Sequence, residues 1–362
     1  MAEKKLTKGN EALAEGAVRA GCRFFAGYPI TPQNEVPEYM SWRLPQVGGA
    51  FVQSESEVSA INMVYGAAST GVRCMTSSSS PGMSLKQEGI SYAAGADLPI
   101  FIGSVMRGGP GLGNIAGAQG DYWQATRGGG HGDYRTFVMA PNGANEMGNF
   151  PHKCFEVSFK YRIPSMVLAD GIIGQMMEPV EFTNPELDPK SFPDQKWALG
   201  VNGGREKRIV KSYDLREGYL EIMVNERVKR YRQIEENEVL YEEKMLADAD
   251  IALVAYGISA RVSVAAMKLA REKGLKVGLL RPITLWPFPK ARLVELSKRI
   301  KKFVVVEMSL GQMVEDVQLA LNGRSDIFLH ARPGAAMLTA EEVCKTLENV
   351  SKKGAKEYAA AK

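Results

Sequence analysis

The stretch Phe51-Val-Gln-Ser-Glu-Ser-Glu-Val-Ser-Ala-Ile-Asn-Met-Val-Tyr-Gly66 passes from an apolar, strand-like segment into an amphipathic, helix-like one, with two carboxylates at the junction. Residues 50–53 predict a buried strand and residues 57–69 a helix. At the mouth of a parallel sheet, a carboxylate commonly caps the following helix or holds a cofactor. On spacing alone Glu57 fits the first use, because Ser54-Glu-Ser-Glu57 matches the Ser-x-x-Glu capping box. The use of Glu57 decides whether the chain belongs to an enzyme or is an ordinary α/β protein.

The alternation of strand and helix continues on both sides of this stretch. Further strands are expected at residues 22–26, 72–76, 99–105, 136–140 and 165–169, and further helices at residues 10–20, 84–94 and 141–161. Such alternation indicates a parallel sheet with helices on both faces. Residues 1–182 are therefore predicted to form one α/β domain.

A second, smaller α/β domain is predicted at residues 248–345. Its strands are expected at residues 251–256, 276–280 and 303–307, and its helices at residues 259–273, 289–299 and 313–321. Residues 183–247 are predicted to be a proline-rich linker and then a long charged helix at residues 214–247, whose basic run 227–232 should face solvent. Residues 346–362 are expected to form an exposed tail.

Composition and charge exclude several classes of protein. The chain is 45% hydrophobic and 24% charged, as in a soluble globular protein, and its net charge of +4 over 362 residues does not suggest nucleic-acid binding. It has no apolar signal segment and no apolar run of about 18 residues, so we expect a cytoplasmic protein without membrane insertion. Four cysteines, none in a Cys-x-x-Cys pair, are expected to be buried thiols rather than zinc or iron–sulfur ligands: Cys22, Cys74, Cys154 and Cys344.

Polar or glycine-rich loops follow four predicted strands of the first domain, at residues 27–34, 53–57, 76–82 and 106–114. Because open parallel sheets bind ligands at the carboxyl ends of their strands, these loops should meet at one edge. Thr31 lies between two prolines and offers a rigid hydroxyl, with an ordinary turn threonine as the alternative. Arg107 offers a guanidinium for a carboxylate, with a surface arginine as the alternative.

Two further segments carry reactive side chains without a complete motif. Gly128-Gly-Gly-His-Gly-Asp-Tyr134 places His131 and Asp133 in a loop that a ligand or another chain could approach closely, or in a flexible surface loop. Asp170-Gly171 is half of a metal–diphosphate Gly-Asp-Gly motif and is interpreted as a turn at a strand end. No P-loop follows Arg107, and no metal-ligand set is predicted on this chain.

Five ordered motifs resemble a known family. The chain closely resembles the alpha subunit of 2-oxoacid:ferredoxin oxidoreductases, most of all the branched-chain (3-methyl-2-oxobutanoate) type, at residues 27–32, 53–58, 75–82 with 87–92, 105–114 and 128–134. The resemblance covers almost the whole chain and includes Pro282-Ile-Thr-Leu-Trp-Pro287 in the second domain. Five motifs in order are far more specific than any one of them.

The resemblance implies a thiamine diphosphate enzyme. The first domain would be the parallel-sheet, pyrimidine-binding type and the second a transketolase C-terminal-like domain. A beta subunit would share the cofactor and supply the diphosphate and Mg²⁺ site, with gamma and ferredoxin-like delta subunits completing the complex and iron–sulfur clusters held by the partners. The complex would convert a branched-chain 2-oxoacid and coenzyme A to acyl-CoA, CO2 and reduced ferredoxin. Two alternatives stay open: 2-oxoglutarate as substrate, with Arg127 or Arg135 as a second cation, and a non-catalytic scaffold subunit.

The resemblance also assigns roles residue by residue. Glu57 would hydrogen-bond N1′ of the cofactor's aminopyrimidine and activate the cofactor, while Glu55 would have a supporting or structural role. Arg107 and Thr31 would hold the carboxylate and the keto oxygen of the 2-oxoacid. The remaining cofactor-binding candidates are Tyr28, Pro29, Ile30, Ser80 and Gln87, and the candidate loop contacts are Asn114, His131 and Asp133.

Overall fold

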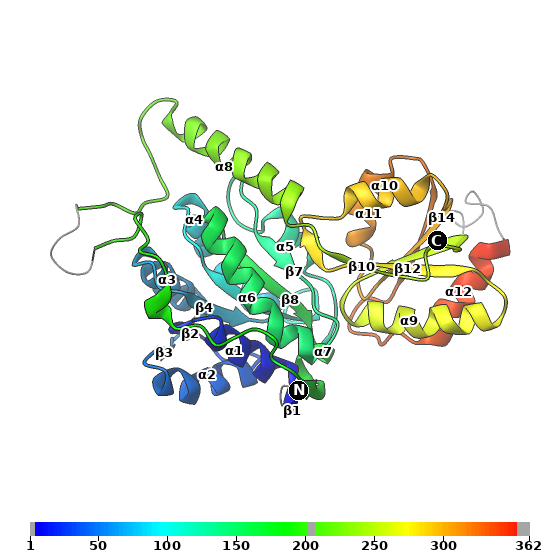
Figure 1. The fold of residues 1–362 in the computed structure, drawn as a ribbon, viewed down its shortest axis with the longest axis horizontal. Helices are drawn as coiled ribbons and strands as arrows, with labels where there is room; N and C mark the ends of the chain where they lie inside the picture. The colour runs from blue at the N-terminus through cyan, green and yellow to red at the C-terminus, as the bar shows by residue number, and fades with distance from the viewer. Residues whose placement is uncertain (1–3, 201–206, 353–362) are drawn as a thin grey trace.

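The computed structural model describes residues 4–200 and 207–352, which form two lobes side by side (Figure 1). The larger lobe is built on an eight-stranded sheet, in which β6 (Asn114–Gly117) pairs with β5 off the main path. The order along that path is β13 (Thr284–Trp286), β7 (Phe137–Met139), β8 (Ser165–Asp170), β5 (Phe101–Gly108), β4 (Cys74–Ser78), β2 (Phe24–Gly27) and β3 (Ala50–Gln53).

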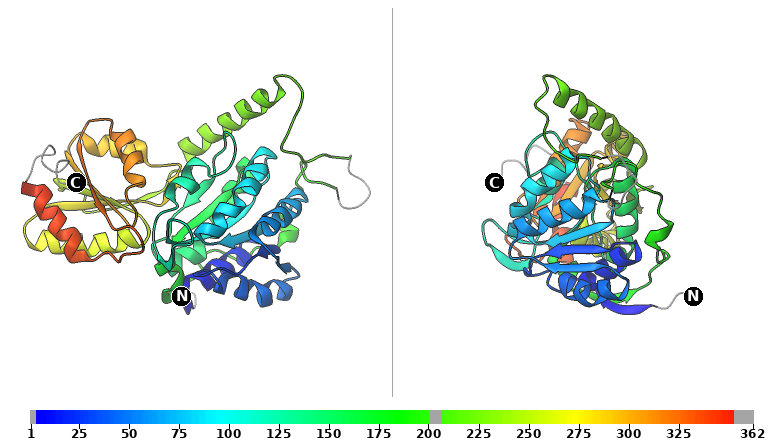
Figure 2. Two further views of the ribbon diagram at one scale, coloured as in Figure 1. Left: turned by 180° about the vertical axis from the view of Figure 1, so that it is seen from behind. Right: turned by 90° about the vertical axis from the view of Figure 1, so that its left-hand side faces the viewer.

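Neighbouring strands of this sheet run parallel from β7 to β3, and β13 joins β7 antiparallel. Helices cover both faces, as the sequence predicts (Figure 2). Side chains alternate between the faces: Phe25 and Met75 pack toward α1 (Gly9–Arg19), α2 (Glu35–Gln46) and α6 (Ala144–Tyr161), whereas Ala26 and Cys74 pack toward α3 (Glu57–Ser69), α4 (Ser80–Gly95) and α5 (Tyr122–Arg127). Burial of apolar area on both faces stabilises this lobe.

The smaller lobe contains a five-stranded sheet with helices on both sides (Figure 1). Its strand order is β10 (Tyr241–Lys244), β12 (Val277–Pro282), β11 (Ile251–Ala255), β14 (Lys302–Glu307) and β15 (Asp326–Ala331). Its helices are α9 (Gly257–Glu272), α10 (Lys290–Ser297), α11 (Met313–Leu321) and α12 (Ala340–Lys352). A two-stranded antiparallel sheet, β1 (Lys5–Lys8) with β9 (Met177–Val180), closes the edge of the larger lobe beside α1.

Several predicted boundaries are wrong. Helix α4 begins at Ser80 rather than at residue 84, because Ser79 is extended and Pro81 suits the first turn of a helix. Helix α2 is absent from the prediction, since Pro37 and Pro45 conceal its pattern although Pro37 lies in the tolerant first turn. Helix α12 runs to Lys352, so the first residues of the predicted tail are helical, and residues 353–362 lie outside the described part.

The long charged helix predicted at residues 214–247 is shorter, because α8 spans Tyr219–Asn237 and β10 follows it. Only part of its basic run faces solvent, because Lys229 and Arg232 are exposed, as predicted, whereas Arg227 and Arg230 bind the larger lobe. Arg227 is 5% exposed and donates from Nε to Asp97 Oδ1 at 2.8 Å, and Arg230 donates to the same oxygen at 2.6 Å. Asp97 of the larger lobe therefore anchors α8, which Figure 1 shows along the top of that lobe.

Asp170 joins the two lobes at the end of β8. Its Oδ1 accepts the Ile173 N–H of α7 (Gly171–Gln175) at 3.0 Å, and its Oδ2 accepts the Ile258 N–H of α9 at 2.9 Å. Burial raises the pKa of Asp170 to about 6, despite these backbone donors. The segment predicted to be a strand-end turn, Asp170-Gly171, is thus the start of α7. The Asp170 carboxylate caps both α7 and, in the other lobe, α9.

Three further predictions concern the cysteines, membrane insertion and the proline-rich segment. All four cysteines are free and buried, as predicted. Among the described residues, no helix has the length and apolar character needed to cross a membrane. The proline-rich segment after β9 is irregular, with one short 3-10 helix at Pro189–Ser191.

Candidate active site

Four parallel strands, β2, β3, β4 and β5, end at one edge of the large sheet and bring the predicted loops together there. Gly27 pairs with Gln53, and Ser78 pairs with Ser104. The residues that follow these positions are therefore neighbours in space although they are far apart in sequence. The expectation that the loops share one edge is confirmed.

Glu57 is the first residue of α3 and is 6% exposed. The capping-box interpretation is wrong, because Ser56 caps the helix by accepting the Ser59 N–H at 3.2 Å. The Ser54 hydroxyl donates to the Gly27 carbonyl at 3.0 Å instead. Glu55 is exposed, and hydrogen bonds from its own backbone N–H and then from Ser59 lower the pKa of its carboxyl. The two carboxylates of the opening stretch thus lie in different environments.

Gly82 of α4 lies directly against the Glu57 carboxylate. A methyl group at Gly82 would stand 2.6 Å from Glu57 Oε1 and 2.2 Å from Ser78 Oγ, so no side chain fits there. The hydroxyls of Ser78 and Ser79 are buried and have no hydrogen-bond partner in the described part of the chain. A buried carboxylate beside unpartnered hydroxyls and a bare backbone position suits a flat, polar ring such as an aminopyrimidine.

Arg107 is buried at the end of β5, so the surface-arginine alternative is wrong. One guanidinium nitrogen donates to the Thr31 carbonyl at 2.9 Å, and another donates to the Leu112 carbonyl at 2.9 Å. Its Nε is buried without a partner. The structure thus brings Thr31 and Arg107 into contact through the Thr31 backbone, while the Thr31 side chain lies on the exposed turn.

Ser80 links Arg107 to an acidic residue that the sequence did not reveal. The Ser80 hydroxyl donates to Asp121 Oδ2 at 2.5 Å and accepts the Arg107 backbone N–H at 3.0 Å. Burial raises the pKa of Asp121, against the lowering effects of Ser80 and of the Arg107 charge. Asp121 precedes a six-residue helix and belongs to no motif, so no sequence signal could have placed it here.

Hydrogen bonds to the Pro32 carbonyl hold the loop after β2 in place. Both Asn10 Nδ2 and Gln175 Nε2 donate to the Pro32 carbonyl at 2.8 Å, and both also donate to Glu35 Oε2 at 2.8 Å. Lys8 completes the network with an ion pair to Glu35 at 2.9 Å. These residues come from distant parts of the chain, so their meeting was not predictable from spacing.

The cofactor-binding candidates of the same loop differ in exposure. Tyr28 and Pro29 are exposed, and Ile30 is half-buried. The Tyr28 carbonyl accepts the side-chain amide of buried Gln33 at 3.4 Å. The loop backbone is therefore held by Gln33, while the side chains of Tyr28 and Pro29 are exposed to a ligand or a partner chain at this edge of the sheet.

The glycine-rich loop at residues 128–134 packs against α4. The Tyr134 hydroxyl donates to Gln87 Oε1 at 3.4 Å, and the Ser91 hydroxyl donates to the His131 carbonyl at 2.5 Å. The side chains of His131 and Asp133 are exposed. The structure thus places buried Gln87 beneath this loop and leaves the two ionisable loop residues facing outward.

Asn114 begins β6, where its Oδ1 accepts the Ala116 N–H at 2.9 Å and the residue is exposed. It lies beside the end of β5, because it pairs with Gly108. The structure gives Asn114 a turn-forming contact and keeps it near Arg107. Within residues 4–200 and 207–352, no three His, Cys, Asp or Glu side chains are grouped to hold a metal ion.

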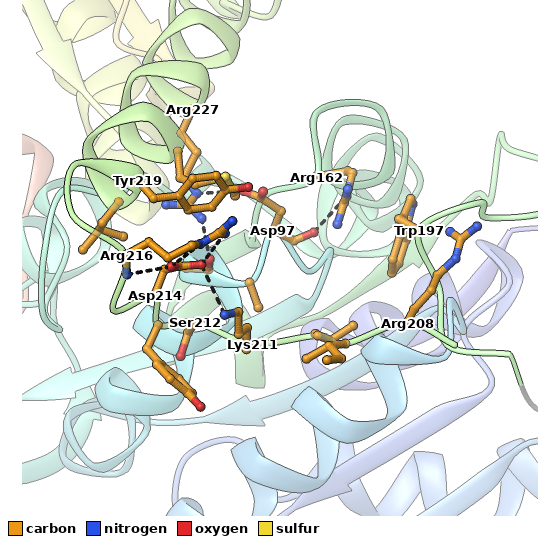
Figure 3. Close-up of a pocket in the computed structure, with 17 residues that line it drawn as sticks. Asp97, Arg162, Trp197, Arg208, Lys211, Ser212, Asp214, Arg216, Tyr219 and Arg227 are labelled. Atoms are coloured by element: carbon orange, nitrogen blue, oxygen red, sulfur yellow. Dashed lines mark hydrogen bonds and ion pairs between the residues drawn. The ribbon is translucent and has the colours of Figure 1, made fainter. Parts of the chain in front are cut away.

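A separate pocket of about 400 Å³ lies between the start of α8 and the C-terminal end of α4. Figure 3 shows its charged side chains turned toward one another. Asp97 pairs with Arg227 at 2.8 Å, and Asp214 pairs with Arg216 at 2.7 Å and with Lys211 at 3.2 Å. None of the predicted site residues lines this pocket. The Asp97–Arg227 pair holds α8 against the larger lobe, whereas the pairs of Asp214 lie within the segment before α8.

Comparisons with known proteins identify the family of the chain. Residues 15–238 match the family described as pyruvate flavodoxin/ferredoxin oxidoreductase, thiamine diphosphate-binding, and residues 249–343 match core domain II of pyruvate:ferredoxin oxidoreductase. The chain is 50% identical to the ketoisovalerate oxidoreductase subunit VorB of Methanothermobacter marburgensis, over 96% of this chain and 98% of that one. It is 38% identical to the 2-oxoglutarate synthase subunit KorA of Methanocaldococcus jannaschii, over 93% and 97% of the two chains.

Two solved structures share the fold. A chain of the 2-oxoglutarate:ferredoxin oxidoreductase from Magnetococcus marinus, solved with 2-oxoglutarate, coenzyme A and succinyl-CoA bound, has a TM-score of 0.85 at 24% identity. This chain is covered over 96% of its length and spans 65% of that chain. A split-gene transketolase, described as an inactive beta4 tetramer, has a TM-score of 0.60 at 12% identity over 97% and 99% of the two chains.

These matches confirm the fold class and the resemblance that the sequence predicts. The family match spans the strands and loops that form the candidate edge, including Glu57 and Arg107. The chain therefore belongs to the pyruvate flavodoxin/ferredoxin oxidoreductase family, contains its thiamine diphosphate-binding domain, and is a subunit of a 2-oxoacid:ferredoxin oxidoreductase.

Proposed function

We propose that the chain is the alpha subunit of an enzyme that oxidatively decarboxylates 3-methyl-2-oxobutanoate with coenzyme A, giving an acyl-CoA, CO2 and reduced ferredoxin. The observation that carries the proposal is the buried Glu57 carboxylate at the carboxyl edge of the sheet, beside Gly82 and the unpartnered hydroxyl of Ser78. When bound, thiamine diphosphate supplies a carbon nucleophile for the 2-oxoacid. Glu57 would hydrogen-bond N1′ of its aminopyrimidine, with Ser78 and Ser79 as nearby polar partners.

Arg107 and Thr31 are proposed to hold the substrate. The Arg107 guanidinium is buried, where a carboxylate would interact with it strongly, and one Arg107 nitrogen has no partner. Its two bonds to backbone carbonyls fix the guanidinium and the Thr31 turn relative to each other. The arrangement would orient a small 2-oxoacid before reaction. The Ser80 hydroxyl helps to fix Arg107, because it accepts the Arg107 backbone N–H and donates to Asp121.

The identity of the 2-oxoacid rests on the relatives and on two arginines. The relatives named for ketoisovalerate are 50% and 49% identical to this chain, whereas those named for 2-oxoglutarate are 35–38% identical. A second substrate carboxylate would require another cation at the site. Arg127 is paired with Glu315 at 2.7 Å, and Arg135 donates to the Thr126 carbonyl at 3.2 Å. Because both arginines are already engaged, the site favours a 2-oxoacid whose branched side chain carries no charge.

Partner subunits are proposed to complete the site. Exposed apolar side chains surround the edge, on the loop after β2, the first turns of α3 and α4, and the segment after β5: Tyr28, Val58, Leu85, Leu112 and Ile115. Leu112 is 81% exposed, which suits a surface that another chain covers. A beta subunit there would bring the diphosphate and Mg²⁺ site, while gamma and delta subunits would carry electrons through iron–sulfur clusters to ferredoxin. A cytoplasmic location also stays a prediction.

The test uses the co-purified complex with a panel of 2-oxoacids, coenzyme A and a low-potential electron acceptor. We expect 3-methyl-2-oxobutanoate to give the highest kcat/KM. Glu57→Gln should leave the subunits assembled and lower kcat by about 100-fold or more, as removal of a proton-transfer group does. Glu55→Gln is the matched control, because this carboxylate lies two residues away and is exposed. Equal turnover of Glu57→Gln and wild type would reject the cofactor role, and a preference for 2-oxoglutarate would reject the substrate.

A further inference from the structure

A buried lysine of α4 lies one turn beyond Gly82, which faces Glu57, and has no role in the site described above. Lys86 of α4 is 0% exposed. Its Nζ donates to the hydroxyl of Thr76 on β4 at 2.7 Å, and Thr76 is also fully buried. A lysine ammonium carries three N–H donors and a full charge, so a single neutral hydroxyl satisfies little of it. Burial of such a group needs a compensating charge nearby.

The packing of α3 against α4 identifies that charge. Gly82 faces Glu57, and seven residues later Gly89 faces Ile61, whose side-chain carbon would stand 2.5 Å from a methyl at Gly89. Gly82, Lys86 and Gly89 are spaced four and three residues apart, so they form one stripe on α4. Glu57 and Ile61 are likewise one turn apart on α3. Lys86 therefore enters the interface between the two helices one turn beyond the Glu57 carboxylate.

The charges around this pair come from few elements. The Glu57 charge acts on Lys86 and favours its protonated form, while burial opposes it more strongly and lowers the pKa of Lys86 to about 7. From β4, the neutral hydroxyls of Thr76 and Ser78 face the lysine and the glutamate respectively. Glu88 of the same helix is exposed and accepts the Tyr92 hydroxyl instead. The Asp121 carboxylate accepts the Ser80 hydroxyl and interacts with the Arg107 charge, so it is engaged away from Lys86.

We propose that Lys86 is a positioning residue for Glu57, a buried cation that keeps this carboxylate ionised and aimed at the cofactor edge. The inference rests on the proposed role of Glu57. Burial disfavours the charged form of a carboxylate, and a cation in the same buried interface offsets that effect, which matters most at acidic pH. Lys86 holds its own proton in that same acidic range, since its pKa is about 7.

Three substitutions at Lys86 separate charge from packing. Lys86→Met keeps the length and the apolar stem but removes the charge. Lys86→Gln also removes the charge and keeps a donor for Thr76, whereas Lys86→Arg keeps the charge. The matched control is Lys268→Met, the same chemical change at an exposed position of α9. Each variant is measured as the assembled complex.

The first readout is the pH dependence of kcat/KM. Loss of the cation should move the acid limb to higher pH by about one unit in both Lys86→Met and Lys86→Gln, the size expected for removal of a nearby opposite charge. Lys86→Arg should restore the wild-type limb, and Lys268→Met should not change it. If Lys86→Gln behaves as wild type and Lys86→Met does not, the lysine acts through its hydrogen bond and the charge proposal is overturned.

The second readout is independent of turnover. Infrared spectra of the cofactor-free complex are recorded across pH, and the protonated-carboxyl band of Glu57 is identified by its loss in Glu57→Gln. This band should appear at higher pH in Lys86→Met than in wild type, by about one unit. A band that titrates at the same pH in both overturns the Lys86 inference even if Glu57→Gln is inactive. An active Glu57→Gln complex would instead contradict the proposed function, so the two failures are distinguishable.

Discussion

Glu55 and Glu57 are two residues apart, and their surroundings give them different chemistry. Glu55 faces solvent, where a carboxylate is stable as an anion and contributes little to binding. Glu57 lies under α4 against Gly82, so any partner of its carboxylate must also be desolvated and will interact with it strongly. At this scale burial, rather than residue type, separates the exposed carboxylate of Glu55 from the carboxylate proposed to bind the cofactor.

Arg107 leads to the first prediction, at the same scale. Arg107→Ala should lower kcat/KM for the 2-oxoacid by about 100-fold, because it removes the carboxylate partner and also releases the Thr31 and Leu112 carbonyls from a fixed geometry. Arg107→Lys keeps a charge but not the planar fork, so it should recover only part of this loss. Steady-state kinetics of the complex measure both, and unchanged constants in Arg107→Ala would contradict substrate binding.

The positions of individual residues were predictable where a motif carried them. Glu57, Arg107 and Thr31 stand in ordered segments, and the structure places all three at one edge. Asp121 and Lys86 were not predictable, because an aspartate after a glycine and a lysine on a helix read as surface residues. Lys86 is buried and Asp121 is half-buried because of how α4 and α5 pack, and no local pattern encodes that packing.

At the scale of elements, the contact between α3 and α4 decides the shape of the site. The two helices touch where Gly82 faces Glu57 and where Gly89 faces Ile61, and the missing side chains at these glycines let the helices approach closely. The glycines lie seven residues apart, about two helical turns. Close approach of the helices is what places Lys86 and Glu57 in a shared, dry interface.

Gly82→Ala is the second prediction. Its methyl would overlap Glu57 Oε1 and Ser78 Oγ, so we expect a loss of stability of about 1–3 kcal/mol and strongly weakened thiamine diphosphate binding. Gly66→Ala on α3 is the matched control, because nothing lies within 4 Å of a methyl there. That variant should gain about 0.5–1 kcal/mol. Chemical denaturation and cofactor titration of the complex measure both effects, and equal cofactor affinity in the two variants would refute the assignment.

The strands and helices of the larger lobe were largely predictable, because apolar runs alternate with amphipathic ones. The start of α3 at Glu57 agrees with the predicted range. Helix α2 was missed because two prolines interrupt its pattern, and β13 was missed because three residues with a neighbouring proline carry too little signal. Strand β10 lies in the predicted linker and was missed, because it is paired with β12, which follows it by more than 30 residues of chain.

At the scale of the whole molecule, Asp170 links the lobes and gives the third prediction. Its pKa of about 6 lies above the ordinary value of 3.8, so the folded state holds the proton more tightly than the unfolded state. The stability of the wild type should therefore fall relative to Asp170→Asn as pH rises from about 4 to about 6, by about 2–3 kcal/mol. Urea denaturation of both proteins across this range measures the difference. A difference that does not vary with pH would show that Asp170 does not titrate in the folded protein.

The proposed split of the site between chains gives the fourth prediction. Purified without partners, this chain should show little thermal stabilisation by thiamine diphosphate and Mg²⁺, because it would hold the cofactor at the pyrimidine end alone. The assembled complex should be stabilised by several degrees under the same conditions. Thermal denaturation with and without the cofactor makes the comparison, and tight binding by the isolated chain would contradict a shared site.

Strand β13 has a consequence for how the chain can be divided. It follows β12 of the small sheet in sequence, yet it lies at the end of the large sheet and covers the outer edge of β7. A fragment ending between the lobes would lose this cover and present an unpaired strand edge, a surface prone to aggregation. The seam between the lobes is therefore a poor place for truncation or gene splitting, and a soluble form of the larger lobe would need residues 284–286 grafted back onto β7.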